Sequence, residues 1–269
     1  RRERIKVKKF LLPSILTLAL TLGLAVPAFG AEEPAKAEVT VNAQPTYFSA
    51  EVYDGTAYIP FYGGVQLLRP DAEITWEEGT FYARAADFTM TVKVGDPYLV
   101  INDRYLYIPM GVKGWADGTA LVPARVLATA LGAWVDWTGK VELCSGGVPL
   151  KAEDCPYDET MLDLMARVIT HESGNQPLEG KMAVGNVILN RVNSAQFPNT
   201  VSEVIYSPNQ FPGATNATPN AESILAARLV MEGANVVPGA YYFNGVGKPC
   251  WASRNKTLIR VIGGHAFYG

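Results

Sequence analysis

Histidine is scarce in this chain, which has only two, His171 and His265, among 269 residues. A catalytic zinc site usually takes three protein ligands, and imidazole is the usual protein ligand for copper. No HExxH or similar spacing surrounds either histidine. A site of two histidines and one glutamate stays open, but we expect a protein without a metal and without a cofactor.

Cysteine is also rare, and its number is odd. Cys144, Cys155 and Cys250 form neither a CxxC motif nor a zinc-binding spacing. An oxidising exterior permits a disulfide between Cys155 and Cys250, and the alternative is three free thiols. A catalytic pair of Cys250 and His265 is a weaker prediction, because nothing around Cys250 indicates a helix start that would activate the thiol.

Acidic residues become few toward the C-terminus. After Asp163 the chain has no aspartate and five glutamates: Glu172, Glu179, Glu203, Glu222 and Glu232. A standard glycosidase places two carboxylates across the scissile bond. Here Glu172 is the one that stands out, because it continues an apolar stripe at helical spacing: Met161, Leu164, Met165, Val168 and Ile169. A carboxylate on an inward helix face is costly unless it is paired or serves chemistry.

The charge of the chain is unevenly distributed. Residues 1–30 hold six basic residues and one acidic residue, so the remainder has a net charge of −8, and nucleic acid is not an expected partner. Residues 31–155 carry 17 acids and nine bases, whereas residues 156–269 carry eight of each. This asymmetry predicts two domains.

The first thirty residues have the pattern of a secretory signal peptide. A basic stretch, "RRERIKVKK", precedes an apolar run and the small residues of "AFG", so we expect cleavage after Gly30. The alternative is an uncleaved membrane anchor. We predict a signal peptide over 1–30, a linker over 31–37, a secreted and wall-associated protein, and no membrane contact after cleavage.

One phrase occurs twice in the first half. "DGTAYIP" (54–60) returns as "DGTALVP" (117–123), and a phrase with acids and tryptophan follows each copy, at 71–79 and 132–140. The Asp-Gly pairs predict turns that lead into strands, and residues 123–133 predict a short helix between Pro123 and Gly132. We therefore expect a duplicated small α+β module over residues 38–147.

The stretch "DGTALVPARVLATALGAWVDW" resembles the copper amine oxidase N-terminal-like domain of secreted bacterial proteins. Residues 38–147 contain no histidine, so we expect no copper. The resemblance implies a stalk or wall-attachment unit. The apolar spacing of "VPARVLATALG" indicates core residues rather than a binding surface.

The second half predicts helices. A first helix continues to Ser173, with Gly174 as a left-handed cap, a second covers 178–192, and a third covers 220–233 with Asn220 at its start. Asn186 and Asn190 share one face of the second helix, where they contact a sugar or tether the helix to a loop. We expect the basic residues between 248 and 260 either to pair with carboxylates of the substrate or to form a solvated strand edge.

The run "LMARVITHESGNQPLEGKMAVGNVILNRVNSAQFPNTVSEVIY" resembles the cell wall hydrolase family of spore cortex-lytic enzymes (SleB/CwlJ-type). Later motifs also match: "NQF" (209–211), "AYYFN" (240–244), "SR" (253–254) and "IGGHAF" (262–267). The resemblance implies a largely helical, lysozyme-like catalytic domain over 156–269. It also implies cleavage of peptidoglycan glycan strands between N-acetylmuramic acid and N-acetylglucosamine, with the family's catalytic glutamate at Glu172.

These observations predict an α+β protein that acts as a lytic transglycosylase with Glu172 as acid and base. The expected sugar groove comprises Asn190, Gln210, Phe211, Tyr241, Tyr242, Asn244, Trp251 and His265. If "AYYFN" is a strand, Tyr242 and Phe243 point to opposite sides, and His265 orients the site or is a hydrogen-bonded core residue. Two alternatives remain: a muramidase in which Glu179 or an amide holds water, and a non-catalytic protein that only binds peptidoglycan.

Overall fold

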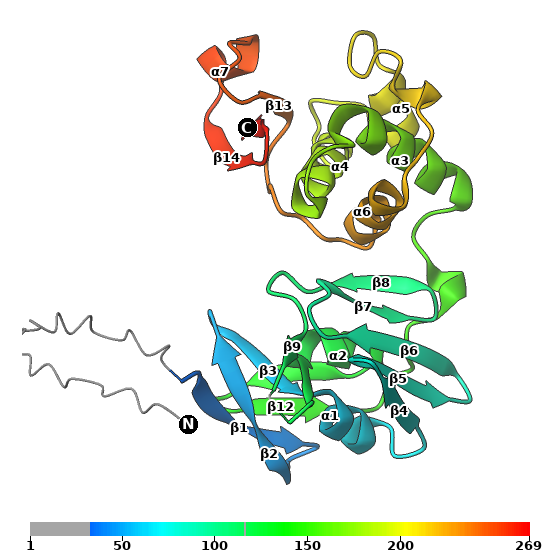
Figure 1. Cartoon of the computed structure of the whole chain (residues 1–269), viewed down its shortest axis with the longest axis vertical. Coiled ribbons are helices and arrows are strands. Elements are labelled where there is room, and N and C mark those ends of the chain that lie inside the picture. Colours follow the sequence, from blue (N-terminus) through cyan, green and yellow to red (C-terminus); the bar gives the residue numbers. More distant parts are fainter. Residues whose placement is uncertain (1–32, 116) are drawn as a thin grey trace, which may run out of the picture. The chain divides into compact units, whose positions relative to one another are not determined.

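The computed structural model describes residues 33–115 and 117–269 (Figure 1). The predicted signal peptide and the first residues of the predicted linker lie outside this range. In the described part, no helix is both long and apolar enough to cross a membrane. Strand β1 already begins at Ala35, inside the segment expected to be a linker.

Two sheets build the first module. The seven-stranded sheet has the order β11-β12-β1-β2-β3-β10-β9, and a five-stranded meander runs from β4 to β8. The strands are β1 (Ala35–Val41), β2 (Gln44–Tyr53), β3 (Thr56–Pro60), β4 (Glu73–Glu77), β5 (Thr80–Ala85), β6 (Phe88–Lys93), β7 (Tyr98–Ile101), β8 (Arg104–Tyr107), β9 (Lys113–Gly114), β10 (Ala120–Pro123), β11 (Trp134–Trp137) and β12 (Val141–Cys144).

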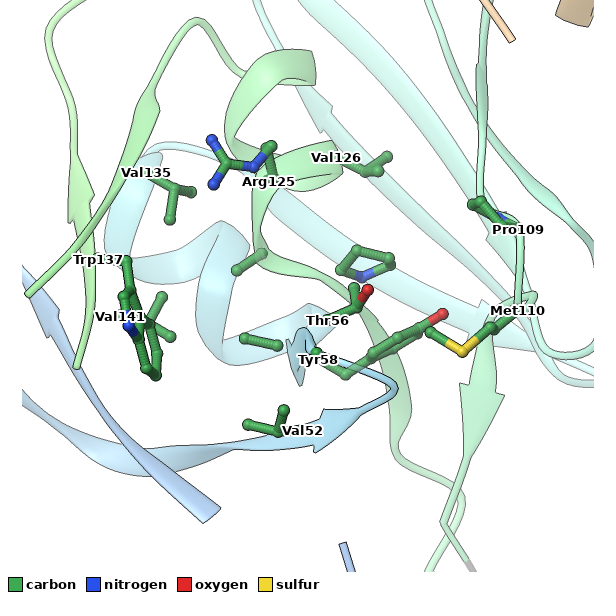
Figure 2. Close-up of a pocket in the computed structure, with 14 residues that line it drawn as sticks. Val52, Thr56, Tyr58, Pro109, Met110, Arg125, Val126, Val135, Trp137 and Val141 are labelled. Atoms are coloured by element: carbon green, nitrogen blue, oxygen red, sulfur yellow. The ribbon is translucent and has the colours of Figure 1, made fainter. Parts of the chain in front are cut away.

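The two repeated phrases lie next to each other in the sheet. They form β3 and β10, which pair antiparallel with Ile59 opposite Val122. Each strand ends at a proline that precedes a helix, so α1 (Phe61–Leu68) follows Pro60 and α2 (Ala124–Ala130) follows Pro123. A cavity in this module is lined by residues of β2, β3, β12 and the start of α2 (Figure 2).

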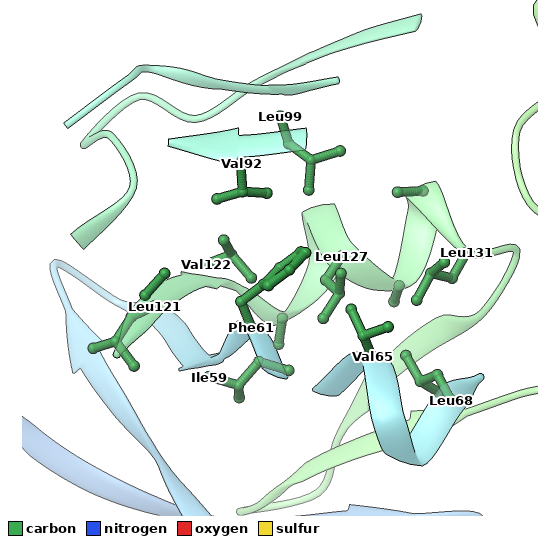
Figure 3. Close-up of a cluster of buried hydrophobic side chains, with 14 of the residues drawn as sticks. Ile59, Phe61, Val65, Leu68, Val92, Leu99, Leu121, Val122, Leu127 and Leu131 are labelled. Atoms are coloured by element: carbon green, nitrogen blue, oxygen red, sulfur yellow. The ribbon is translucent and has the colours of Figure 1, made fainter. Parts of the chain in front are cut away.

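Helices α1 and α2 supply much of the first core (Figure 3). Phe61 and Leu127 are fully buried, and the Phe61 ring meets Phe81 of the meander edge-on, with centroids 6.0 Å apart. In α2, Leu127 and Ala128 are buried while Arg125 is exposed. The predicted core role of 123–133 is confirmed for the apolar residues of the helix.

The second module has its own core, formed mainly by three helices. Its elements are η1 (Ala152–Asp154), α3 (Glu159–Ser173), α4 (Leu178–Val192), α5 (Val201–Tyr206), η2 (Ala214–Asn216), α6 (Ala221–Met231), β13 (Tyr242–Gly245), α7 (Trp251–Asn255), β14 (Leu258–Ile262) and β15 (His265–Tyr268). The Asp158 carboxylate accepts the Met161 N–H at the start of α3, and Asn220 caps α6 in the same way. The three strands form a small antiparallel sheet with β15 in the middle.

The sequence prediction for Gly174 is wrong. Gly174 is right-handed, with φ −56°, and a Cβ there would lie 2.5 Å from the Thr170 carbonyl oxygen, so glycine is needed for space rather than for a left-handed cap. Of the two alternatives stated for the cysteines, the structure has the second: Cys144, Cys155 and Cys250 are all free thiols.

Gly132→Ala is expected to destabilise the first module far more than Gly139→Ala. Both glycines have positive φ, 70° and 87°, so each alanine meets left-handed strain of about 1–2 kcal/mol. A Cβ at Gly132 would also lie 2.0 Å from the Val148 carbonyl oxygen, whereas a Cβ at Gly139 meets nothing within 4 Å. Thermal unfolding of the two variants measures the difference, and equal losses would contradict this account.

Candidate active site

Glu172 lies in the last turn of α3, where buried residues fix the helix against the core. Val168 and Ile169, one turn earlier, are fully buried, and the Glu172 side chain is half-buried. Burial raises the pKa of this carboxyl, and the neighbouring His171 opposes the shift. No hydrogen bond or ion pair to Glu172 occurs in the described parts of the chain.

The other four glutamates after Asp163 all have partners. Three form ion pairs: Glu179 with Arg260 at 2.8 Å, Glu222 with Lys181 at 2.5 Å, and Glu232 with Arg104 at 2.6 Å. Glu203 accepts a 2.8 Å hydrogen bond from the Thr200 hydroxyl. Each of these four carboxylates is thus held by a neighbouring side chain, whereas Glu172 is not.

A cleft of about 500 Å³ opens beside Glu172. Its lining comes from the loop before η2, from β13, from the start of α7 and from β15. Seven of the nine predicted site residues line it: Glu172, Gln210, Phe211, Tyr242, Asn244, Trp251 and His265. The sequence therefore identified most of the residues that the fold brings together around the carboxylate.

Asn190 and Tyr241 do not line the cleft. The Asn190 amide donates to the carbonyls of Val237 and Ala240, both at 2.9 Å, and accepts a hydrogen bond from Asn235. Tyr241 stacks on Phe197, with centroids 5.7 Å apart. Asn190 tethers α4 to the loop between α6 and β13, which is the structural alternative stated for it, and we leave both residues out of the proposed sugar groove.

His265 contributes an imidazole without a partner. Its Nδ1 atom is buried and has no hydrogen bond, contrary to the expected hydrogen-bonded core histidine. The ring meets Phe243 and Phe267 edge-on, at 5.5 and 6.2 Å. Burial lowers the pKa of His265, and the cation of Lys248 lowers it further, so the imidazole is neutral at pH 7.

Arg191 is the functional residue that the sequence analysis missed. It is 5% exposed, lines the cleft, and donates to the Tyr241 carbonyl at 2.8 Å and to Gln210 Oε1 at 2.7 Å. Its guanidinium also lies over the rings of Phe211 and Tyr242, at 5.5 and 5.7 Å. Burial lowers the pKa of Arg191, and no carboxylate among the described residues pairs with it.

The signal for Arg191 was present in the sequence. It follows Ile188 by three positions and Val187 by four, so it continues the apolar face of a predicted helix. The same criterion identified Glu172. When this criterion is applied to basic as well as acidic residues, it indicates both Glu172 and Arg191, the half-buried acid and the buried base that line the cleft.

Cys250 also lines the cleft, and its surroundings differ from the prediction. It caps the short helix α7, where its sulfur accepts the Ser253 N–H at 3.3 Å. This hydrogen bond lowers the pKa of the thiol. No hydrogen bond joins Cys250 to His265 in the residues described, so the alternative of a Cys–His nucleophile gains no geometric support.

Gln176 connects the end of α3 to the hairpin that carries His265. Its Oε1 atom accepts the Gly264 N–H at 2.7 Å, and its Nε2 atom donates to Asn175 at 2.8 Å. The buried ammonium of Lys181 donates to the Gln176 carbonyl. Gly263 has a positive φ of 54°, which favours glycine, and a Cβ there would displace the Gln176 amide oxygen, which lies 2.4 Å away.

Comparison with known proteins gives two domain matches. Residues 175–268 match the Cell Wall Hydrolase family, and residues 39–145 match the Copper amine oxidase N-terminal domain. The first match begins three residues after Glu172. The second contains no histidine, and in the described residues no three His, Cys, Asp or Glu side chains cluster to hold a metal, so these residues do not fit copper.

Similar curated proteins are spore cortex-lytic enzymes. The enzyme of Bacillus cereus is 38% identical over 41% of this chain and 45% of its own length. That of Oceanobacillus iheyensis is 34% identical over 46% of each chain. The chain thus spans less than half the length of these relatives.

Two solved catalytic domains are also similar. The SleB domain of Bacillus cereus shares 34% identity, with 42% of this chain and 92% of that chain covered and a TM-score of 0.39. The germination-specific lytic transglycosylase SleB of Bacillus anthracis shares 33%, with 42% and 97% covered and a TM-score of 0.40. The two family matches thus identify a cell wall hydrolase domain over residues 175–268, preceded by a copper amine oxidase N-terminal domain over residues 39–145.

Proposed function

We propose that this protein is a secreted peptidoglycan lytic transglycosylase that cleaves between N-acetylmuramic acid and N-acetylglucosamine. The observation that carries the proposal is the unpaired, half-buried carboxyl of Glu172 beside a cleft, while the other late glutamates have partners. The relatives named as spore cortex-lytic enzymes support peptidoglycan as the substrate.

One carboxyl group is sufficient for this reaction. Protonated Glu172 donates its proton to the glycosidic oxygen as the bond from that oxygen to C1 of muramic acid breaks. The C6 hydroxyl of the same sugar then attacks C1, and the Glu172 carboxylate takes the hydroxyl proton. The products are a 1,6-anhydromuramic end and a new 4-hydroxyl, and Glu172 is again protonated. A raised pKa favours the first step, because the donor must start in its acid form.

The cleft also offers groups for a sugar chain. The Trp251 ring is 59% exposed, and Tyr242 meets it edge-on at 5.5 Å. Aromatic faces stack on sugar rings, and the Gln210 and Asn244 amides supply hydrogen bonds to sugar hydroxyls and acetamido groups. Neutral His265 provides one further donor or acceptor.

A muramidase would need a second group to hold water. Glu179 is the nearest alternative in sequence, but its carboxylate pairs with Arg260 at 2.8 Å and does not line the cleft. The geometry therefore supports the lyase better. A protein that only binds peptidoglycan would not need an unpaired acid there.

The proposal extends to architecture and location. We infer that the first module arose by duplication, supported by the antiparallel pairing of Ile59 with Val122 at equivalent positions of the repeat. We also infer a lysozyme-like catalytic domain, secretion through the N-terminal segment, and wall attachment through the first module.

Glu172→Gln is expected to lower turnover of purified sacculi by about 10²–10⁴-fold with the fold intact, because the amide cannot donate or accept the proton. Loss of turbidity measures turnover, and circular dichroism checks the fold. Glu179→Gln is the matched control and should keep most activity. Near-normal turnover of Glu172→Gln would refute the assignment.

Mass spectrometry of the products distinguishes the reaction types. Anhydromuramic ends are expected, whereas reducing ends would replace the lyase by a hydrolase. Sacculi that bind the wild-type protein without losing turbidity would instead indicate a binding protein.

Glu172→Gln should also change stability in a pH-dependent way. The pKa of Glu172 is raised above its ordinary value of 4.5, so ionisation of this group destabilises the folded state as the pH rises through that raised pKa. Below pH 4 the carboxyl of the wild type is protonated, so it is uncharged like the amide of the variant. The variant should therefore have the same melting temperature as the wild type in acid and a higher one at pH 7. A difference in melting temperature that does not change with pH would contradict burial of an unpaired carboxyl.

Gln176→Ala is expected to lower kcat about tenfold with little change in KM, because the segment after α3 loses its hydrogen bond to Gly264, next to His265. Gln196→Ala, at an exposed glutamine of a loop, is the control. Gln176→Glu should restore kcat, since its carboxylate also accepts the Gly264 N–H. Its charge should raise the pKa of Glu172 and move the alkaline limb of the kcat profile to higher pH. A loss of melting temperature without this shift would indicate a purely structural role.

A further inference from the structure

The first module contains a cavity of about 570 Å³ that the proposed reaction does not use (Figure 2). Most of its wall is apolar, and the lining residues are Val52, Gly55, Thr56, Ala57, Tyr58, Pro109, Met110, Pro123, Ala124, Arg125, Val126, Val135, Trp137 and Val141. None of these fourteen residues is acidic. The volume falls within the usual range of small-ligand sites, about 300–1,000 Å³.

Arg125 is the single charged group of the lining. It is exposed, and it forms no ion pair or side-chain hydrogen bond with the residues that the structure describes. It stands in the first turn of α2, where a cation gains nothing from the helix dipole. Neither an ion pair nor helix stability accounts for an arginine at this place.

The rest of the wall offers little to a polar ligand. The Tyr58 hydroxyl already donates to the Gly111 carbonyl at 3.1 Å, so the other polar side-chain groups of the lining are the Thr56 hydroxyl, the Trp137 indole N–H and the Arg125 guanidinium. Trp137, 56% exposed on β11, and Val135, two positions earlier on the same strand, form an apolar wall in the part of Figure 2 where Arg125 lies. A sugar ring would leave most of its hydroxyls without partners here.

We propose that this cavity binds the C-terminal carboxylate of a short peptide with small apolar side chains, the chemistry of the D-alanyl ends of peptidoglycan stem peptides. The guanidinium pairs with the carboxylate, and the methyl groups replace water on the valine, alanine and tryptophan walls. The choice of a cell-wall peptide rests on the proposed function, whereas the site itself does not.

The charge of the module restricts the ligand further. Residues 31–155 carry 17 acids and nine bases, so their long-range field repels a free anion. An exposed ion pair adds only about 0–1 kcal/mol. Both the carboxylate and the apolar part are therefore needed, and acetate alone should not bind.

Calorimetric titration of the full chain carrying Glu172→Gln tests the site without cleavage of any glycan. The probes are N-acetyl-D-alanyl-D-alanine, its C-terminal amide, and acetate. The acid should bind at least fivefold more tightly than the amide. In Arg125→Gln this preference should vanish, with the acid weakened to the level of the amide.

Two further variants complete the test. Ala57→Phe fills the cavity and should abolish binding of the acid, with the melting temperature as a check of folding. Arg84→Gln removes an exposed arginine of β5 that lies outside the cavity lining, and it should bind like its parent.

Three results would overturn the proposal: no heat from the acid at millimolar concentration, equal affinity for acid and amide in the parent, or equal losses in Arg84→Gln and Arg125→Gln. Binding through Arg125 in a protein that proves inactive on glycan would leave this inference standing while the proposed function fails. Glycan cleavage by a protein that does not bind the peptide would leave the proposed function standing and would overturn this inference.

Discussion

Desolvation of one unpaired carboxyl is the constraint on which the second module depends. Glu172 lies one turn beyond fully buried Val168 and Ile169, so the packing of α3 determines where its side chain projects. A partner would remove the energetic cost of its burial, yet no ion pair to Glu172 occurs among the described residues. Burial therefore raises the pKa of Glu172, and His171 opposes the shift.

Arg191 shows how the cleft accommodates an opposite charge without neutralising the acid. An ion pair between Arg191 and Glu172 would stabilise both groups and hold the carboxyl in its ionised form. Instead, the guanidinium donates to the Tyr241 carbonyl and to Gln210, and aromatic rings surround it. Neutral acceptors thus satisfy the arginine, and it does not offset the raised pKa of Glu172.

Local signals in the sequence predicted local structure well. The bounds of α4 follow from its apolar period, and Asn220 is the predicted cap of α6, because these features depend on neighbours within one helical turn. The role of Asn190 could not be predicted in this way, since its partners lie about 50 positions away at Val237 and Ala240.

The errors in the predicted site also arise from contacts that a local sequence pattern does not reveal. The cap at Cys250 depends on a five-residue helix too short to leave a periodic pattern, and the space at Gly174 depends on the Thr170 carbonyl rather than on a turn type. Glu172 was predictable because a charge interrupting an apolar stripe is visible in one dimension. Arg191 interrupts an apolar stripe in the same way, and it was missed because only acidic residues were considered at such positions. The signal peptide stays a prediction.

The properties of the two modules are complementary if both act on one polymer. An attachment site with a single exposed arginine binds weakly, because a solvated ion pair contributes about 0–1 kcal/mol and a few methyl groups contribute about 0.8 kcal/mol each. A wall presents stem peptides at high local density, so weak binding still raises the concentration of the catalytic cleft near glycan strands. Tight binding would hold the enzyme at one peptide after the nearby bonds were cut. The lone Arg125 in an acidic module therefore suits an enzyme that must release the wall and bind it again.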